Sequence, residues 1–141
     1  MQKIFKNARG MTLIEIMVVI TILGLIAAMV TVNVMSRLDK AKVDTTKTQI
    51  KSLEQALEQY RLDNGSYPTT EQGLNALVTA PSGDAAKRFQ PGGYIKKVPQ
   101  DPWRHDYSYL SPGTNGHPYE ITSNGSDGQE GTDDDIKSSE D

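Results

Sequence analysis

An uncharged, apolar run near the amino terminus constrains the fold of this chain more than any other feature. Residues 16–35 hold no charged side chain over 20 positions, and a helix that spans a bilayer needs about 20 apolar residues. Because the chain is 141 residues long, only one small domain can accompany such a helix. We therefore expect residues 11–35 to form a transmembrane helix and residues 36–141 to form a globular domain.

The charges ahead of this run predict its orientation. Lys3, Lys6 and Arg9 precede the run and no acidic residue does, so the positive-inside rule predicts a cytoplasmic amino terminus. A cleaved secretory signal is the alternative. The run is too long for such a signal, however, and no A-x-A-like site follows it.

One acidic side chain, Glu15, stands at the head of the apolar run. A carboxylate inside hydrocarbon costs about 2.5–3.5 kcal/mol on insertion scales, so a residue of this kind usually has a partner. The alternative is that Glu15 lies hydrated at the membrane surface and makes no specific contact. The residues alone leave both interpretations open.

The segment around Glu15 resembles the class III signal of type IV pilins and of the pseudopilins of type II secretion. A basic leader, Gly10 and then Met-Thr-Leu-Ile-Glu-Ile carry this resemblance. It implies that residues 1–10 are a leader, which prepilin peptidase removes by cutting between Gly10 and Met11. It further implies that the new amino group of Met11 is methylated, and that this amine pairs with Glu15 of a neighbouring subunit. The family usually has phenylalanine in place of Met11 and often proline in place of Val32, so no proline kink is expected.

A helical pattern continues beyond the apolar run. Apolar side chains recur at intervals of 3, 4 and 3 positions, namely Ile50, Leu53, Leu57 and Tyr60. This spacing gives one apolar stripe on a helix. The turn signal at residues 63–65 predicts where the helix ends. We expect one helix from near Met11 to Leu62, about 75 Å long at 1.5 Å per residue.

The remaining residues predict a small α+β domain. We expect a short helix from Thr69 or Thr70 to Val78, with that threonine as N-cap, and a loop over residues 80–93. Short strands are expected at three places, namely Tyr94-Ile95, Tyr107 to Leu110 and Tyr119 to Thr122. Two or three antiparallel strands would pack on the helix stripe under an aromatic cover, which consists of Trp103, Tyr107, Tyr109 and Tyr119.

The resemblance extends through this domain and becomes more specific there. The segments over residues 63–74, 92–95 and 99–103 are similar to those of the major pseudopilin of type II secretion, the G subunit. True type IV pilins commonly close this region with a disulfide, and this chain has no cysteine. The implied fold is type IV pilin-like: a long amino-terminal helix, first transmembrane and then amphipathic, packed on a small antiparallel sheet with a carboxy-terminal calcium-binding loop.

The carboxy-terminal segment is rich in carboxylates. Five of them fall within nine positions, namely Asp127, Glu130, Asp133, Asp134 and Asp135. Calcium takes about six to eight oxygen ligands from flexible loops, and the interspersed glycines let a loop curl so that carbonyl groups point inward. A solvated acidic tail is the alternative, because the spacing is not that of an EF-hand.

The resemblance also implies which atoms would bind calcium. The carboxylates of Asp127, Asp134 and Asp135 match the aspartate positions of the family. Backbone carbonyls would complete the set, at Asn124, Gln129 and Thr132. Ile136 is expected to pack beneath this loop, and residues 137–141 are expected to fray.

No catalytic chemistry or nucleic-acid binding is indicated. His105 and His117 lie in turn or strand-edge sequence, with no serine–carboxylate arrangement recognisable around them. The glycines follow no phosphate-binding pattern, and the net charge of −3 gives no reason to expect nucleic acid.

The resemblance implies a structural subunit of the type II secretion pseudopilus, a short periplasmic filament whose growth exports folded proteins across the outer membrane. The subunit would cross the inner membrane once, with its domain in the periplasm. Its partners would be further copies of itself, prepilin peptidase, an inner-membrane assembly platform, minor pseudopilins and, before extraction, membrane lipid. Two alternatives stay open: a type IV pilin for adhesion, motility or DNA uptake, and an anchored calcium-binding module that never polymerises.

Overall fold

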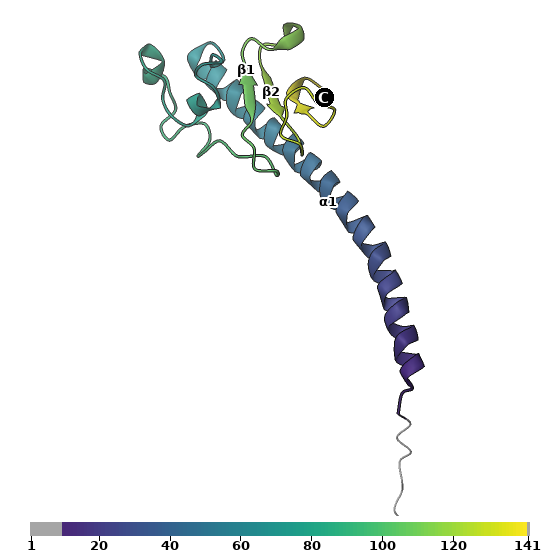
Figure 1. Ribbon diagram of the computed structural model, residues 1–141. Helices are drawn as coiled ribbons and strands as arrows, with labels where there is room; N and C mark the ends of the chain where they lie inside the picture. The colour runs from purple at the N-terminus through teal and green to yellow at the C-terminus, as the bar shows by residue number, and fades with distance from the viewer. Residues whose placement is uncertain (1–9, 141) are drawn as a thin grey trace, which may run out of the picture. The chain divides into compact units, whose positions relative to one another are not determined.

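The computed structural model describes residues 10–140, so the expected leader, apart from Gly10, lies outside the described residues. The chain divides into two compact units, and the boundary lies between Asp39 and Lys40. The helix α1, Leu13–Asn64, is 52 residues long and contributes to both units (Figure 1). The single long helix predicted from the sequence is therefore confirmed, with an end two residues beyond the expected Leu62.

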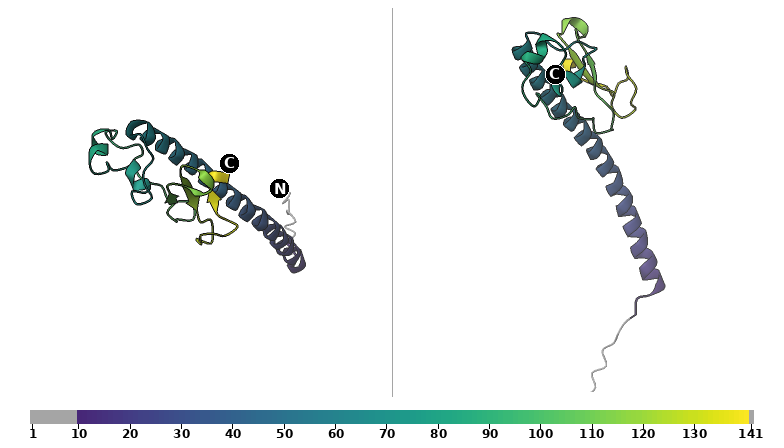
Figure 2. Two further views of the ribbon diagram at one scale, coloured as in Figure 1. Left: turned by 90° about the horizontal axis from the view of Figure 1, so that it is seen from above. Right: turned by 90° about the vertical axis from the view of Figure 1, so that its left-hand side faces the viewer.

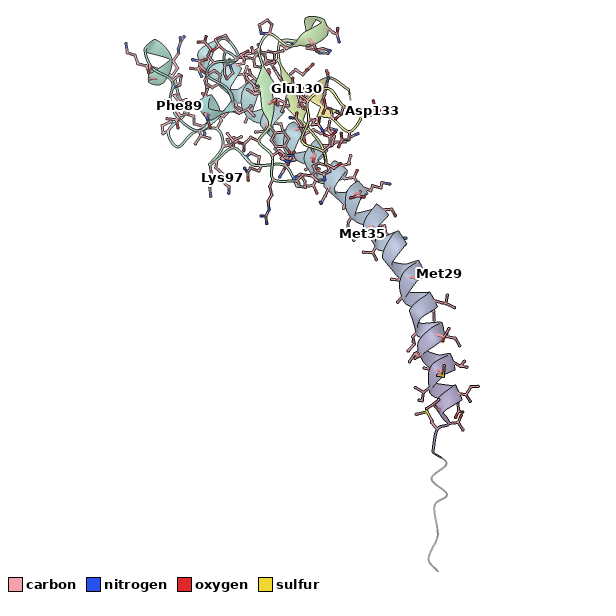
Figure 3. The ribbon with its side chains drawn as sticks, viewed as in Figure 1. Met29, Met35, Phe89, Lys97, Glu130 and Asp133 are labelled. Atoms are coloured by element: carbon pink, nitrogen blue, oxygen red, sulfur yellow. The ribbon has the colours of Figure 1, made fainter. Side chains whose placement is uncertain are left out.

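In the first unit, which ends at Asp39, α1 carries its apolar side chains on the outside. The large apolar side chains of residues 13–30 are exposed, from 42% at Ile16 to 81% at Leu13. Met29 and Met35 are exposed in the same way (Figure 3). By length and composition α1 can cross a membrane. Exposed apolar surface on this scale marks an interaction with lipid or with other protein.

In the second unit, which begins at Lys40, the remainder of α1 forms one side of a core. Two leucines of the predicted stripe, Leu53 and Leu57, are 2% and 0% exposed, and burial of each stabilises the unit by about 1.5–3 kcal/mol. The helix ends where Gly65 adopts a φ of 84° and donates its N–H to the carbonyl of Arg61. The core contains these buried apolar residues: Ile50, Leu53, Ala56, Leu57, Tyr60, Leu74, Ala76, Leu77, Tyr107, Ile121 and Ile136.

A three-stranded antiparallel sheet packs against this stretch of helix (Figure 2). The order of its strands is β1-β2-β3. The strands are β1 (Ser108–Leu110), β2 (Glu120–Ser123) and β3 (Ile136–Lys137). Tyr109 pairs with Ile121, and Ser123 pairs with Ile136. The predicted aromatic cover is confirmed, since Tyr107 is buried and Trp103, Tyr109 and Tyr119 pack against the core.

Two local predictions between the helix and the sheet need correction. The expected helix ending at Val78 shrinks to a 3₁₀ turn, η1 (Leu74–Leu77), although Thr69 does accept the N–H of Gln72 as a cap would. The strand expected at Tyr94-Ile95 is wrong. Both of its N–H groups donate to one carbonyl, that of Leu77, so no ladder forms and the segment is a tight bend. Further 3₁₀ turns are η2 (Asp84–Lys87) and η3 (Thr114–Gly116).

The fraying expected after Ile136 is also wrong for the described residues. Lys137 belongs to β3 and is followed by the 3₁₀ turn η4 (Ser138–Glu140). The hydroxyl of Ser138 accepts the N–H of Ile121 at 3.0 Å, which ties this end of the chain to β2. Asp141 lies outside the described residues.

Candidate assembly and metal sites

The expected processing bond lies just ahead of α1. Gly10 and Met11 are both exposed, and they precede the first helical residue, Leu13. A Cβ added to Gly10 would meet no atom within 4 Å. Among the described residues, none therefore covers the peptide bond between Gly10 and Met11.

Glu15 forms a capping box with Thr12 at the start of the helix. The carboxylate of Glu15 accepts the N–H of Thr12 at 3.1 Å, and the hydroxyl of Thr12 accepts the N–H of Glu15 at 3.3 Å. The reciprocal pair satisfies two N–H groups that a helix start leaves without partners. The Thr-x-x-Glu spacing is readable in the sequence but was missed there. The amine that is expected to pair with Glu15 belongs to a neighbouring subunit, and the structure contains a single chain.

The acidic loop, residues 124–135, connects β2 to β3 in the second unit. Its carboxylates differ in exposure. Glu130 and Asp133 lie exposed on the loop (Figure 3), as does Asp127, whereas Asp134 and Asp135 are half-buried. Glu130 and Asp133, the two carboxylates that the expected ligand set leaves out, are thus both exposed to solvent.

Asp134 organises the loop through hydrogen bonds to both of its carboxylate oxygens. Oδ2 accepts the N–H and the hydroxyl of Ser126, at 2.7 and 2.8 Å, and the N–H of Asp127 at 3.1 Å. Oδ1 accepts the hydroxyl of Thr132 at 2.7 Å. Hydrogen bonds from Thr132 and then Ser126 hold the pKa of Asp134 well below its usual range. This carboxylate therefore stays ionised at any physiological pH.

The hydroxyl of Thr132 brings three of the expected ligand groups together. Besides Asp134, it lies 3.3 Å from Oδ1 of Asp127 and 3.1 Å from the carbonyl oxygen of Gln129. A hydroxyl carries one proton, so it can donate fully to only one of these oxygens. Oδ1 of Asp127 also accepts the N–H of Gln129 at 2.8 Å. Two donors thus serve three converging oxygens, those of Asp127, Asp134 and Gln129, which is an arrangement that suits a cation.

The third expected carboxylate, Asp135, is placed differently. Its Oδ2 accepts the N–H of Gly131 at 2.8 Å, while its Oδ1 is buried and has no hydrogen-bond partner within residues 10–140. Asn124 has a buried side-chain oxygen in the same state, and its carbonyl, which was expected to bind the cation, accepts the N–H of Gly128. The carbonyl of Thr132 likewise accepts the N–H of Asp135.

The loop has the composition of a calcium site but not its closed geometry. Within residues 10–140, no three His, Asp or Glu side chains lie together as metal ligands would. One feature nevertheless fits a cation: the buried Oδ1 of Asp135 has no hydrogen-bond partner among the described residues.

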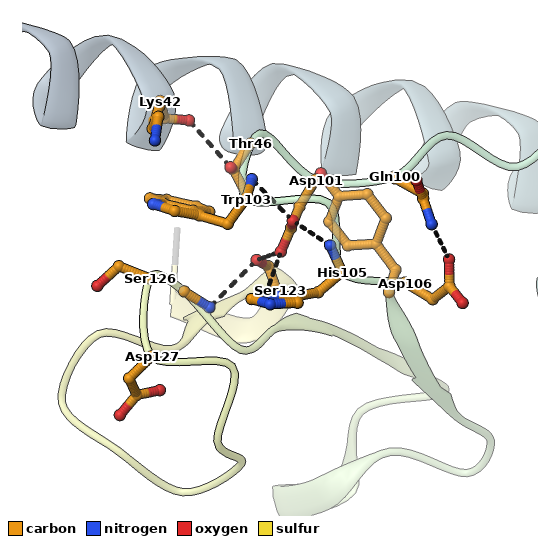
Figure 4. Close-up of polar contacts among 12 residues, drawn as sticks. Lys42, Thr46, Gln100, Asp101, Trp103, His105, Asp106, Ser123, Ser126 and Asp127 are labelled. Atoms are coloured by element: carbon orange, nitrogen blue, oxygen red, sulfur yellow. Dashed lines mark hydrogen bonds and ion pairs between the residues drawn. The ribbon is translucent and has the colours of Figure 1, made fainter.

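The sequence showed no serine–carboxylate arrangement near a histidine, and here the structure differs. His105 lies beside Asp101, whose Oδ2 accepts the hydroxyl of Ser123 at 2.7 Å (Figure 4). Ser123 is fully buried and donates to the carboxylate rather than to the imidazole. A nucleophilic serine must instead give its proton to the histidine. This geometry therefore holds the fold together and does not activate the hydroxyl.

Two sequence profiles match this chain. The profile described as "Type II secretion system (T2SS), protein G" matches residues 33–139. The profile described as "Prokaryotic N-terminal methylation motif" matches residues 5–31.

Relatives with sequence and structural similarity give the same result. The type II secretion system core protein G of Pseudomonas aeruginosa is 53% identical over 127 residues, which cover 89% of this chain and 89% of that protein. The protein of the same description from Escherichia coli K12 is 48% identical over 129 residues, covering 91% and 88%. The crystal structure of the major pseudopilin from the type 2 secretion system of enterohaemorrhagic Escherichia coli has a TM-score of 0.66 and 44% identity, covering 75% of this chain and 93% of that one.

Proposed function

This chain belongs to the type II secretion system protein G family, and we propose that its filament drives folded proteins across the outer membrane. Membership makes it a subunit of the type II secretion pseudopilus. The observation that carries the proposal is the exposed apolar helix of the first unit. Lipid would cover this helix before assembly, and the helices of neighbouring subunits would cover it in the filament. A type IV pilin and a non-polymerising module both fit the family match less well.

Deletion of the gene tests this proposal. Folded substrates should accumulate in the periplasm, and the wild-type gene supplied on a plasmid should restore their release. Type IV pili, where the strain makes them, should be unaffected. Undiminished secretion by the deletion strain would refute the role in export.

The amino-terminal segment supports a proposal for processing and topology. The methylation-motif match over residues 5–31 supports removal of residues 1–10 by prepilin peptidase and methylation of Met11. The exposed position of Gly10 and Met11 is consistent with such a cut. We assign the amino terminus to the cytoplasm, residues 11–35 to the inner membrane and residues 36–141 to the periplasm. An assembly platform and minor pseudopilins would then receive the processed subunit.

Glu15 would select the register of assembly. After the cut, Met11 carries a positive amine, and a buried carboxylate that faces the amine of a neighbouring subunit removes two unpaired charges at once. We expect Glu15→Ala to be inserted and processed normally but to yield almost no sheared filaments. Thr12→Ala is the matched control, because it removes the capping hydroxyl and leaves the carboxylate in place. Equal loss of filaments in both variants would assign the defect to the helix cap instead of the amine pair.

We assign calcium to the acidic loop. Asp127 and Asp134, with the carbonyl of Gln129, would hold the cation from one side, and Asp135 would complete the carboxylate set with its unpartnered Oδ1. The carbonyls of Asn124 and Thr132 would provide further ligands, as the resemblance implies. When bound, the cation would neutralise the repulsion among these carboxylates and link the two ends of the loop.

Calorimetric titration of the full chain in detergent micelles tests the calcium assignment. We expect one calcium ion per chain and a higher melting temperature in calcium than in chelator, since binding to the folded state alone stabilises it. The absence of binding heat, together with an unchanged melting temperature, would refute a calcium site in this loop.

A further inference from the structure

A buried carboxylate adjoins the acidic loop without belonging to the expected ligand set. Asp101 is 3% exposed and lies in the turn that precedes β1. Its Oδ1 accepts the N–H groups of Trp103 and His105, at 3.0 and 2.8 Å, and its Oδ2 accepts the hydroxyl of Ser123 at 2.7 Å (Figure 4). A buried carboxylate is tolerated only when donors surround it in this way. Asp101 therefore fixes the turn over residues 101–105 and the end of β2 in one arrangement.

This turn is connected to the acidic loop indirectly through Ser123 and directly through His105. Ser123 immediately precedes the loop, and its hydroxyl oxygen also accepts the N–H of Gly125 at 3.4 Å. Farther along, the ring of His105 lies so close to Gly128 that a Cβ there would be 3.0 Å from both Cε1 and Nε2. The two contacts bracket the segment from Gly125 to Gly128, which includes Asp127 and the donors to Oδ2 of Asp134.

The opposite side of the turn packs on α1 within the second unit. Nζ of Lys42 lies 5.7 Å from the centre of the Trp103 ring. Just beyond the turn, the hydroxyl of Tyr107 donates to Oε1 of Gln49 at 2.5 Å. Burial, and then the charge of Asp101, raises the pKa of Tyr107, so this hydroxyl remains a donor. The turn over residues 101–105 thus lies between the acidic loop and the helix surface.

We propose that Asp101 is a positioning residue for the calcium site and that it couples cation binding to the packing of Trp103 against α1. The inference rests on the calcium assignment made above. All three donors to Asp101 come from the chain itself, so Asp101 acts through Ser123 and His105 and not as a ligand. Residues that orient metal ligands from behind typically change metal affinity by about 10–100-fold when mutated.

The full chain in detergent micelles allows two measurements on one sample. Calorimetry gives the calcium affinity, and the emission of Trp103 reports on the turn, because the chain contains one tryptophan. We expect the wild-type emission to change with calcium at the midpoint that calorimetry gives. Ser123→Ala, which removes the link between Asp101 and the loop, should weaken calcium binding at least about 10-fold and reduce the emission change. Ser108→Ala is the matched control, because Ser108 is an exposed serine on β1.

The two proposals fail in distinguishable ways. If the wild type binds no calcium, both the metal assignment and this inference are overturned. If it binds calcium while Ser123→Ala and Asp101→Asn both retain wild-type affinity and emission change, this inference alone is wrong. If neither variant folds, the wild type decides: emission that stays constant through the calorimetric midpoint contradicts the coupling, and emission that follows it supports the coupling.

Discussion

Two glycines of the acidic loop allow a matched test of how tightly the loop packs without a cation. Gly125 and Gly131 have φ values of 58° and 88°, so alanine at either position costs about 1–2 kcal/mol of left-handed backbone strain. Their surroundings differ. A Cβ at Gly125 would lie 2.6 Å from Oδ2 of Asp134, whereas a Cβ at Gly131 would meet no atom within 4 Å. Overpacking of this kind adds about 1–3 kcal/mol.

We therefore expect Gly131→Ala to lower the free energy of unfolding by about 1–2 kcal/mol and Gly125→Ala to lower it by about 2–5 kcal/mol. The assay is urea unfolding of the full chain in detergent micelles with chelator present, followed by the fluorescence of Trp103. Equal losses in the two variants would refute the reasoning. They would mean that the loop relaxes around the added methyl group and that Gly125 is not held against Asp134.

Three further predictions concern the core, the pH response and the metal. Leu57→Ala should lower the free energy of unfolding by about 2–5 kcal/mol, because Leu57 is 0% exposed. Leu62→Ala, at a site that is 64% exposed, should change the free energy of unfolding by no more than about 0.5 kcal/mol. Hydrogen bonds from the side chains of Arg61 and Tyr67 lower the pKa of Glu58 from 4.5 to about 2. Its stabilising effect should thus be fully present above pH 4.5 and disappear as the pH falls towards 2, and Glu58→Gln should flatten that part of an acid-unfolding curve. In chelator, the Asp127→Ala variant should have a melting temperature close to that of the wild type. In calcium, it should lose most of the rise in melting temperature that the wild type shows.

The parts of the fold that depend on local pattern were predictable, and those that depend on distant partners were not. The stripe of α1 repeats every three or four residues, so the helix and its buried face follow from spacing alone. The bend at Tyr94-Ile95 looks like a strand in sequence, because nothing nearby shows that the carbonyl of Leu77 takes both N–H groups. The strand β3 is two residues long and is defined only by its pairing with β2.

The candidate sites also divide into features that follow from a local pattern and features that depend on distant residues. The Thr-x-x-Glu spacing at Thr12 and Glu15 was readable, because a capping box is a local pattern. Asp101 carries no such signal, since its burial depends on Ser123, 22 residues farther along the chain. The role of the Thr132 hydroxyl was equally hidden, because it follows from how the loop curls.

The distribution of the core explains why polar links matter so much in this domain. Among the side chains that the structure describes, no apolar residue between Leu77 and Tyr107, or between Ile121 and Ile136, is fully buried. Hydrophobic burial therefore acts mainly on α1 and the strands, and the first connecting segment adds only partly buried side chains, such as Phe89, Val98 and Trp103. A chain without cysteine has no disulfide to hold the two connecting segments. Asp101 fills the role in the first segment, and the hydrogen bonds of Asp134 fill it in the second. A cation in the acidic loop would act on the second segment and, through Ser123, on the first, so one binding event would order both of the least hydrophobic parts of the domain.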